Sequence, residues 1–371
     1  MPSSRTRWLI TLTAPLVAAG GLELGLRIAG FEHVVAPMPI FVWNGLEPDR
    51  ADADMSMHRL DERSLWSPRP GALVSSGSSE CINSRGLRGP EVPAPAASTL
   101  RVVLMGESTM FGVGVPWELT CAPRLEASLE RLGERAQVLN AAVTGHSVLQ
   151  GIERYRFVVR PLDPDVVCAA YGLMAEYSPC QGLPDAEKLA LAREQLASRA
   201  EAWALPRGHL RVLQLLDWCL DRRQEDELRR LTAQRAQERE SGPDVMGRTD
   251  WPGCRRVPLD QFESGLRALA QEVRADGKRL LLISLPRLPA REATHPIQTA
   301  YSRALEQTAA RLDVPLVDVR SAVLDAVEGG ADPASFFLSG DPVHLGPEGQ
   351  ELLAQMLAGA IAEDDAGDGS R

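Results

Sequence analysis

From residue 100 onward, short apolar runs alternate with segments of helical periodicity. The runs are rich in valine and leucine, and each ends at a turn residue such as Gly106 or Gly172. Strands separated by helices favour a parallel sheet with helices on both faces. The sequence therefore predicts an α/β domain over residues 100–362. Its strands are expected at 101–105, 137–140, 165–171, 279–285 and 314–317, and its main helices at 119–133, 148–159, 259–276 and 345–362.

The segment 184–242 interrupts this alternation. It is strongly charged and helical by composition, with leucines such as Leu189, Leu196 and Leu213. Because it follows the third predicted strand, we interpret it as a helical insertion in the domain. Two interpretations stay open: a cap over the functional site, or a packed elaboration that contacts no substrate.

Residues 1–30 combine a cationic start with an apolar stretch. Arg5 and Arg7 precede residues 8–26, which are apolar except for Glu23 and some hydroxyl side chains. The pattern favours an uncleaved membrane anchor or a cleaved signal peptide, and by the positive-inside rule the chain after this stretch is exported. We expect one N-terminal span in the cell membrane and a periplasmic domain. The alternatives are a secreted or periplasmic protein after cleavage, and a cytoplasmic protein in which the segment is a buried helix.

Composition narrows the class of partner. The chain carries 40 basic and 50 acidic residues, a formal net charge of −10, and has no basic run, so nucleic acid is not an expected partner. Its six cysteines are widely spaced, without a CxxC pair. We therefore expect no zinc site, and the cysteines are compatible with disulfides in an oxidising compartment. No phosphate-binding loop or dinucleotide fingerprint occurs, so no metal and no cofactor are expected.

The segments that flank the domain are low in periodicity. Residues 31–99 are rich in Pro, Gly and Ser, which predicts an irregular lead-in over the domain surface. Within it, Arg85 and Arg88 either meet an anionic ligand or lie in a solvated turn. Residues 363–371 are predicted to form a disordered tail.

The most informative turn follows the first predicted strand. Ser108 lies just beyond its carboxyl end, where open α/β sheets bind ligands. A serine nucleophile needs a base within hydrogen-bond reach and an acid that orients the base. Among six histidines, His344 has the best context, because Asp341 precedes it by three residues on a glycine-rich loop before the last helix. We predict that these three residues act together.

Three stretches carry a family resemblance. Residues 106–112 (GESTMFG), 139–145 (LNAAVTG) and 341–344 (DPVH) resemble the sequence blocks of SGNH/GDSL-type serine hydrolases, with Glu107 in place of the customary aspartate. The segments ELGLR and NSRGLRG, at 23–27 and 83–89, resemble the approach segments of the membrane-tethered bacterial kind. The resemblance covers the predicted domain and, more weakly, the lead-in, but not the insertion.

The resemblance implies a fold and a set of roles. The fold is a three-layer α/β/α sandwich around a flavodoxin-like parallel sheet of about five strands. Ser108 would be the nucleophile, His344 the general base and Asp341 its orienter. The backbone N–H groups of Ser108 and Gly145 would form part of the oxyanion hole, and such donors typically contribute about 3 kcal/mol each.

One position departs from the family pattern. After the third strand the family has an asparagine whose side chain is the third oxyanion donor, and this chain has Met174 there. Either another group supplies the donor, or the site uses two backbone donors at a lower rate, or the protein binds without turnover. Nearby, His146, Glu176 and Tyr177 are weaker candidates for the pocket wall, with a surface loop or a helix start as the alternatives.

The sequence thus predicts an enzyme, a serine ester hydrolase that forms an acyl-serine intermediate. The compartment suggests O-acyl esters of cell-envelope carbohydrate or lipid, small-molecule or glycan esters, as substrates, and the N-terminal segment suggests the membrane as a partner. An O-acyltransferase that uses the same intermediate is one alternative. A catalytically inert SGNH-fold binding module is the other.

Overall fold

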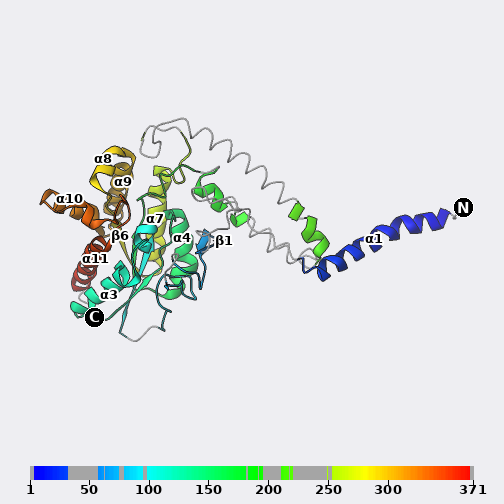
Figure 1. Ribbon diagram of the computed structural model, residues 1–371, viewed down its shortest axis with the longest axis horizontal. Coiled ribbons are helices and arrows are strands. Elements are labelled where there is room, and N and C mark those ends of the chain that lie inside the picture. Colours follow the sequence, from blue (N-terminus) through cyan, green and yellow to red (C-terminus); the bar gives the residue numbers. More distant parts are fainter. Residues whose placement is uncertain are drawn as a thin grey trace.

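A five-stranded parallel sheet forms the centre of the computed structural model (Figure 1). The strands lie in the order β4-β3-β5-β6-β7, so the chain starts inside the sheet, adds β4 on one side and continues on the other. This confirms the predicted parallel α/β sheet. The strands are β3 (Leu100–Gly106), β4 (Ala136–Asn140), β5 (Val166–Ala170), β6 (Arg279–Ser284) and β7 (Leu316–Asp318). The structure describes residues 4–31, 57–61, 63–74, 79–94, 98–180, 183–190, 192–194, 210–216, 218–219, 249 and 253–367.

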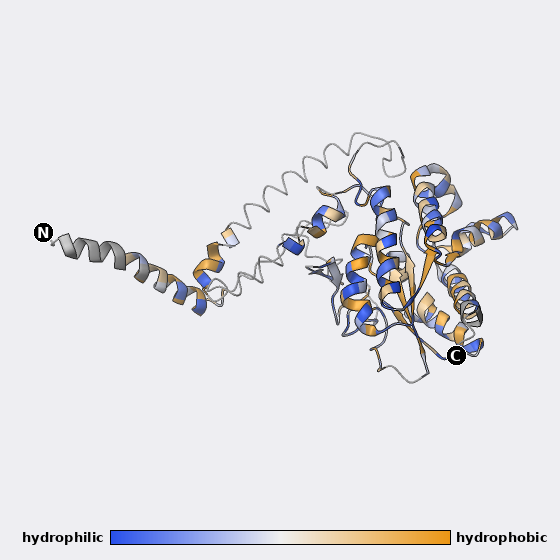
Figure 2. Ribbon diagram, turned by 180° about the vertical axis from the view of Figure 1, so that it is seen from behind, coloured by the Kyte–Doolittle hydropathy of each residue, from blue (hydrophilic) through white to orange (hydrophobic). Residues whose placement is uncertain are grey.

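Helices cover both faces of this sheet, because successive strand residues point to opposite sides. Val102 and Leu104 pack in one apolar cluster with α3 (Cys121–Arg131), α10 (Val319–Glu328) and α11 (Pro347–Gly367). Val103 and Met105 pack in the other cluster with α4 (Val148–Arg154), α7 (Leu259–Ala275) and α9 (Pro296–Leu312). Figure 2 shows apolar residues on the strands and polar residues on the outer helix faces. The shorter helices are α2 (Ser108–Phe111), α8 (Pro289–Thr294), η1 (Trp117–Leu119), η2 (Tyr155–Val159), η3 (Arg160–Leu162) and η5 (Pro333–Phe336).

The structure changes several predicted boundaries. The helix expected at 148–159 is α-helical only to Arg154 and continues as a π-helical turn, η2. The sequence pattern did not indicate α9 or α10. The tail expected to be disordered from residue 363 begins as helix, because α11 continues through Gly367; Ala362, Glu363 and Ala366 have high or moderate helix propensity and extend it.

The lead-in is more ordered than its composition indicates. It contains an antiparallel hairpin of β1 (His58–Asp61) and β2 (Leu65–Pro68). Further along, the N–H of Arg88 donates to the carbonyl oxygen of Asn140, at 3.1 Å, and the two residues form an antiparallel bridge. The lead-in thereby covers the end of the edge strand β4, an arrangement that protects unpaired backbone groups.

The predicted N-terminal segment forms one helix, α1 (Ser4–Ile28). Among the described residues, no helix combines the length and the apolar character that crossing a bilayer requires. Membrane contact through this segment and the location of the protein stay predictions. The described residues 210–216 and 218–219 of the insertion lie beside the C-terminal end of α1, away from the sheet (Figure 1). There the Glu23 carboxylate accepts the N–H of Val212 at 2.9 Å.

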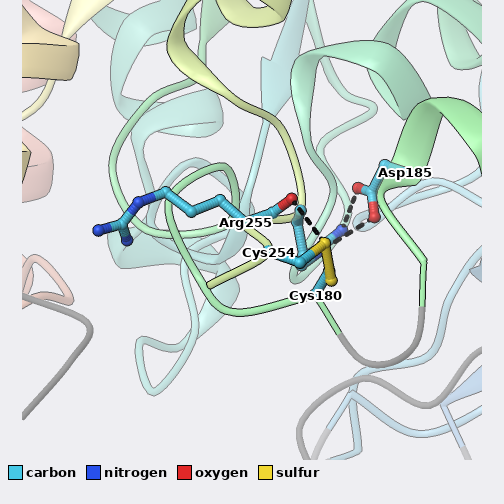
Figure 3. The surroundings of a disulfide bond; sticks show 5 residues. Cys180, Asp185, Cys254 and Arg255 are labelled. Carbon is cyan, nitrogen blue, oxygen red and sulfur yellow. Dashed lines mark hydrogen bonds and ion pairs between the residues drawn. A yellow bond between two sulfur atoms is a disulfide. The ribbon is translucent and has the colours of Figure 1, made fainter. Parts of the chain in front are cut away.

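A disulfide between Cys180 and Cys254 joins the two chain segments at the base of the insertion (Figure 3). The segments run antiparallel, with a bridge between Pro179 and Arg255, so the inserted stretch is wider than the predicted 184–242. Leu189 and Ala192 pack with Leu65 of the hairpin in a small apolar cluster. Most of the segment on which the cap interpretation depends lies outside the described residues.

Candidate active site

Ser108 is the first residue of α2, directly beyond β3. The neighbouring strands β4 and β5 lie on opposite sides of β3, so Ser108 occupies the topological switch point of the sheet. Gly106 permits the turn: its φ is 149°, and a Cβ there would lie 2.5 Å from the carbonyl oxygen of Ala170. A larger residue at this position would displace either the serine or β5.

Two hydrogen bonds connect the three residues that the sequence singled out. The Ser108 Oγ lies 2.9 Å from the Nε2 of His344, and the Nδ1 of the same ring lies 2.6 Å from the Oδ2 of Asp341. The other Asp341 oxygen accepts the backbone N–H groups of Val343 and His344 at 2.8 and 3.0 Å. Partial burial opposes ionisation of Asp341, but the hydrogen bonds from His344 and Val343 prevail and lower its pKa. The roles of the three residues in a reaction stay predictions.

A buried glutamine connects the turn that carries Ser108 with the helix that follows the His344 loop. The Gln350 side chain, on α11, donates to the carbonyl oxygen of Thr109 at 3.0 Å and accepts the N–H of Cys121 at 2.8 Å. The helix that follows the His344 loop is thereby fixed to the turn that carries Ser108. This contact joins residues that are 241 apart in sequence.

Gly145 lies on the loop after β4, which packs against the end of β3. The N–H of Val143 donates to the carbonyl oxygen of Gly106 at 3.0 Å, and Gly145 itself has a φ of 73°. Within the described part of the chain, the N–H groups of Ser108 and Gly145 donate to no protein acceptor. Both are available to a ligand, as the predicted oxyanion hole requires.

The loop that contains Met174 is held in place by hydrogen bonds to the buried side chain of Glu107. This carboxylate, 1% exposed, accepts the N–H groups of Leu173, Met174 and Ala175 at 2.9, 3.1 and 3.1 Å. The Met174 side chain packs partly against the apolar core. The thioether has no hydrogen to donate, and the backbone N–H of Met174 already donates to Glu107, so neither group serves as a third oxyanion donor. The sequence identified the missing asparagine but gave no signal for the role of Glu107 beyond its replacement of an aspartate.

Glu176 is a second buried carboxylate beneath the same loop. It accepts the N–H groups of Val148 and Gly172 at 2.9 and 3.0 Å. Burial and the nearby Glu107 raise the pKa of Glu176 to about 8. Tyr177 is also buried, and its hydroxyl donates to the carbonyl oxygen of Leu173. Glu176 and Tyr177, the two weaker candidates, thus hydrogen-bond backbone groups of the Met174 loop.

The other weak candidates have structural roles. His146 is buried rather than on the surface, and its Nε2 lies 2.9 Å from the carbonyl oxygen of Trp66; burial lowers its pKa. Arg88 is buried as well, rather than in a solvated turn. It donates to carbonyl oxygens of the segment after α2 and pairs with Glu80 at 2.8 Å. Arg85 is exposed.

Arg256 is a further residue that sequence reasoning missed. It lies two residues after Cys254, is buried, and donates to the carbonyl oxygen of Gly145 at 2.8 Å. It also pairs with the buried Asp185 at 2.7 Å, while the neighbouring Arg255 extends away from Asp185 (Figure 3). The base of the insertion is thus connected directly to the Gly145 loop.

Comparison with known families agrees with this geometry. Residues 104–352 match the model of the GDSL-like lipase/acylhydrolase family. The chain belongs to this family. Such enzymes cleave acyl esters, and this protein is accordingly an ester hydrolase in general class. No curated protein matches the chain.

Solved structures resemble the chain at low sequence identity. The lipase/acylhydrolase from Enterococcus faecalis has 16% identity, covers 71% of this chain and 95% of its own, and gives a TM-score of 0.43. Axe2, an acetylxylan esterase from Geobacillus stearothermophilus, has 16% identity, covers 71% of this chain and 94% of its own, and gives 0.43. The acetyl xylan esterase AlAXEase has 16% identity, covers 71% and 100%, and gives 0.41.

Proposed function

We propose that the protein hydrolyses O-acyl esters through an acyl intermediate on Ser108. The hydrogen-bonded chain from Ser108 through His344 to Asp341 is the observation that carries this proposal. In it, the Nε2 of His344 accepts the hydroxyl proton as Oγ attacks the ester carbonyl carbon. Asp341 fixes the tautomer of the ring and stabilises the imidazolium that forms.

The remaining steps use the same residues. When the tetrahedral intermediate collapses, the carbon–alcohol oxygen bond breaks and His344 returns its proton to the departing alcohol. Water then attacks the acyl-serine with His344 again as the base, and the carboxylic acid leaves Ser108. In both stages the N–H groups of Ser108 and Gly145 would stabilise the oxyanion. With Met174 in the third place, this site has two donors where the family pattern has three.

The substrate class follows from the expected compartment. We propose an exported domain that acts on O-acyl esters of cell-envelope carbohydrate or lipid. The Cys180–Cys254 disulfide supports export, because such bonds persist in oxidising compartments. A periplasm-active reporter fused after Thr99 should be active in cells. An inactive reporter, present at normal abundance, would refute export.

A fluorophosphonate probe tests the nucleophile. The purified protein should become labelled, and Ser108→Ala should abolish the labelling. Ser264→Ala is the matched control, because Ser264 is an exposed serine on α7 with only a local hydrogen bond, and it should be labelled like the wild type. Equal labelling of Ser108→Ala and wild type would place the reactive serine elsewhere.

An inert binding module is the second candidate function, and the blocked donor position at Met174 favours it. It predicts a folded protein that is not labelled and releases no acid from any ester. An acyltransferase would use the same acyl-serine intermediate and would therefore also be labelled by the probe. It would transfer the acyl group to an added sugar acceptor instead of releasing it as the free carboxylic acid.

A further inference from the structure

A buried cation that the proposed reaction does not use lies beyond the carboxyl end of β6. Arg287 follows the last strand residue, Ser284, by three positions and is 5% exposed, comparable with 7% for Ser108. The carboxyl ends of parallel strands share one edge of the sheet. Arg287 therefore belongs to the same edge as Ser108.

The segments around Arg287 are those that build the candidate active site. Its guanidinium lies over the Tyr177 ring, with the carbon 5.1 Å from the ring centre, and Tyr177 belongs to the Met174 loop. The next residue, Leu288, donates its N–H to the carbonyl oxygen of Pro342 at 2.9 Å, on the loop between Asp341 and His344. The Arg287 side chain thus contacts the loop of the third-donor position, and the backbone of the next residue contacts the loop that carries His344.

The guanidinium has no anionic partner at ion-pair distance among the described residues. Its Nη2 is buried and makes no hydrogen bond. The carboxylate that acts on its charge is Glu107, whose two oxygens already accept three backbone N–H groups. A buried charge without a partner is costly, and such groups in proteins are nearly always paired or used.

Three other buried arginines of this protein differ in their partners. Arg88 also has a buried nitrogen, Nε, without a hydrogen bond, but its guanidinium pairs with Glu80 at 2.8 Å. Arg256 donates through all three of its side-chain nitrogens, to Asp185, to Gln150 and to a carbonyl oxygen. Arg154 donates to the carbonyl oxygens of Ala141 and Gly86. These residues connect loops, whereas Arg287 has neither an ion pair nor an acceptor for its Nη2 among the residues that the structure describes.

We propose that Arg287 forms a cationic subsite of the active site and selects ester substrates that carry a negatively charged oxygen group, a carboxylate or a phosphate. The guanidinium suits both groups, because its donors match the geometry of oxyacid anions. This inference rests on the proposed ester hydrolysis and adds a charge requirement to its substrate.

Two matched substrate pairs test the subsite. The first compares ethyl hydrogen succinate with ethyl butyrate and places a carboxylate on the acyl side. The second compares the acetyl ester of glycerol 3-phosphate with monoacetylglycerol and places a phosphate on the alcohol side. The wild type should prefer the charged member of at least one pair, and the pair that responds identifies the anion and its side.

Variants at Arg287 test whether this residue causes the preference for charged over neutral esters. Arg287→Gln should lower kcat/KM for the preferred charged ester by about 10- to 100-fold, the range of one charge-assisted hydrogen bond, and change the neutral ester by less than about twofold. Arg287→Lys should retain part of the preference. Arg267→Gln, at an exposed position on α7, removes the same net charge and should leave the preference intact.

Two results would overturn the subsite. One is a wild type that hydrolyses both members of each pair equally. The other is an equal loss on charged and neutral esters in Arg287→Gln, which would indicate a structural role or a contribution to the oxyanion. If no ester is hydrolysed, the proposed function fails, and calorimetric binding of ethyl hydrogen succinate and of acetylated glycerol 3-phosphate to Ser108→Ala decides the subsite alone. The subsite is supported if Ser108→Ala binds at least one of these two esters and Ser108→Ala/Arg287→Gln does not. It is refuted if Ser108→Ala binds neither ester.

Discussion

The two sides of the candidate active site are built in different ways. The Asp341–His344 side is local: four consecutive residues supply a carboxylate, an imidazole and the backbone N–H groups that orient the carboxylate. It is also partly open to solvent, with the Asp341 side chain 31% exposed. The Met174 side is assembled from a distance, by the carboxylate of Glu107, which follows a different strand, β3, and is 1% exposed.

Because of this difference, we expect substitutions on the two sides to affect activity and stability differently. On the local side a substitution should alter the chemistry and leave the fold intact, since its contacts are short-range and hydrated. On the remote side a substitution removes hydrogen bonds from buried N–H groups, and each unpaired buried group costs about 1–3 kcal/mol. Activity and stability should therefore separate at Asp341 and fall together at Glu107.

Asp341→Asn should have the largest effect on rate. The amide oxygen can still accept backbone N–H groups, but the neutral side chain no longer stabilises the imidazolium, so kcat should fall on the order of 10³–10⁴-fold with little change in melting temperature. Asp332→Asn, at a local cap that accepts the N–H of Ala334, is the control and should keep full activity. Steady-state kinetics and thermal melts measure both. A large drop in melting temperature at Asp341→Asn would contradict the local character of this side.

Glu107→Ala should lower both stability and activity. It leaves three N–H groups without their acceptor, so the unfolding free energy should fall by about 3 kcal/mol or more, and kcat/KM by on the order of 10²-fold as the loop moves. Glu107→Asp restores the residue of the family pattern and should be milder in both. Chemical denaturation and ester hydrolysis measure them. Full stability in Glu107→Ala would show that the loop does not depend on this carboxylate.

Met174→Asn should produce a smaller change in the opposite direction. An asparagine would add a side-chain donor at the third-donor position, and we expect kcat to rise by a factor on the order of 10, below the 10²–10³ of one well-aimed donor. Met174→Leu is the control, because it keeps the volume without a donor. An unchanged kcat in Met174→Asn would indicate that another group already occupies this role.

Glu176 should affect the pH dependence of stability and leave catalysis at a fixed pH least changed. Its pKa in the folded protein is about 8, above the ordinary value of 4.5, so its contribution to stability is complete below about pH 4.5 and is lost as the pH rises toward 8. Glu176→Gln removes this titration. The unfolding free energy of the variant should therefore decline less over that window than that of the wild type, by at most about 1.4 kcal/mol per pH unit.

Glu328→Gln, at an exposed glutamate near the end of α10, is the control and should follow the wild type. Denaturant titrations between pH 4.5 and 8 provide the comparison. Parallel curves for wild type and Glu176→Gln would contradict the raised pKa.

Features that depend on contacts between residues close in sequence could be predicted from the sequence, and features that depend on distant contacts could not. Strand β3 and the Asp341–His344 loop were predicted because apolar runs and turn residues are readable over a few neighbouring positions. Helices α9 and α10, the β1–β2 hairpin and the helical start of the tail were not, since their stability depends on packing against distant segments more than on local pattern.

The sequence by itself determined the parallel α/β sheet, the serine after its first strand and the loop that carries Asp341 and His344. Only the tertiary structure decided what surrounds them: the Cys180–Cys254 bond, the support of the Met174 loop by Glu107, and the unpaired Arg287 beside Tyr177. The physical reason is that hydrophobic periodicity and turns are local properties of the chain. The partners of a buried polar group, in contrast, come from whichever strands the folded sheet places next to one another.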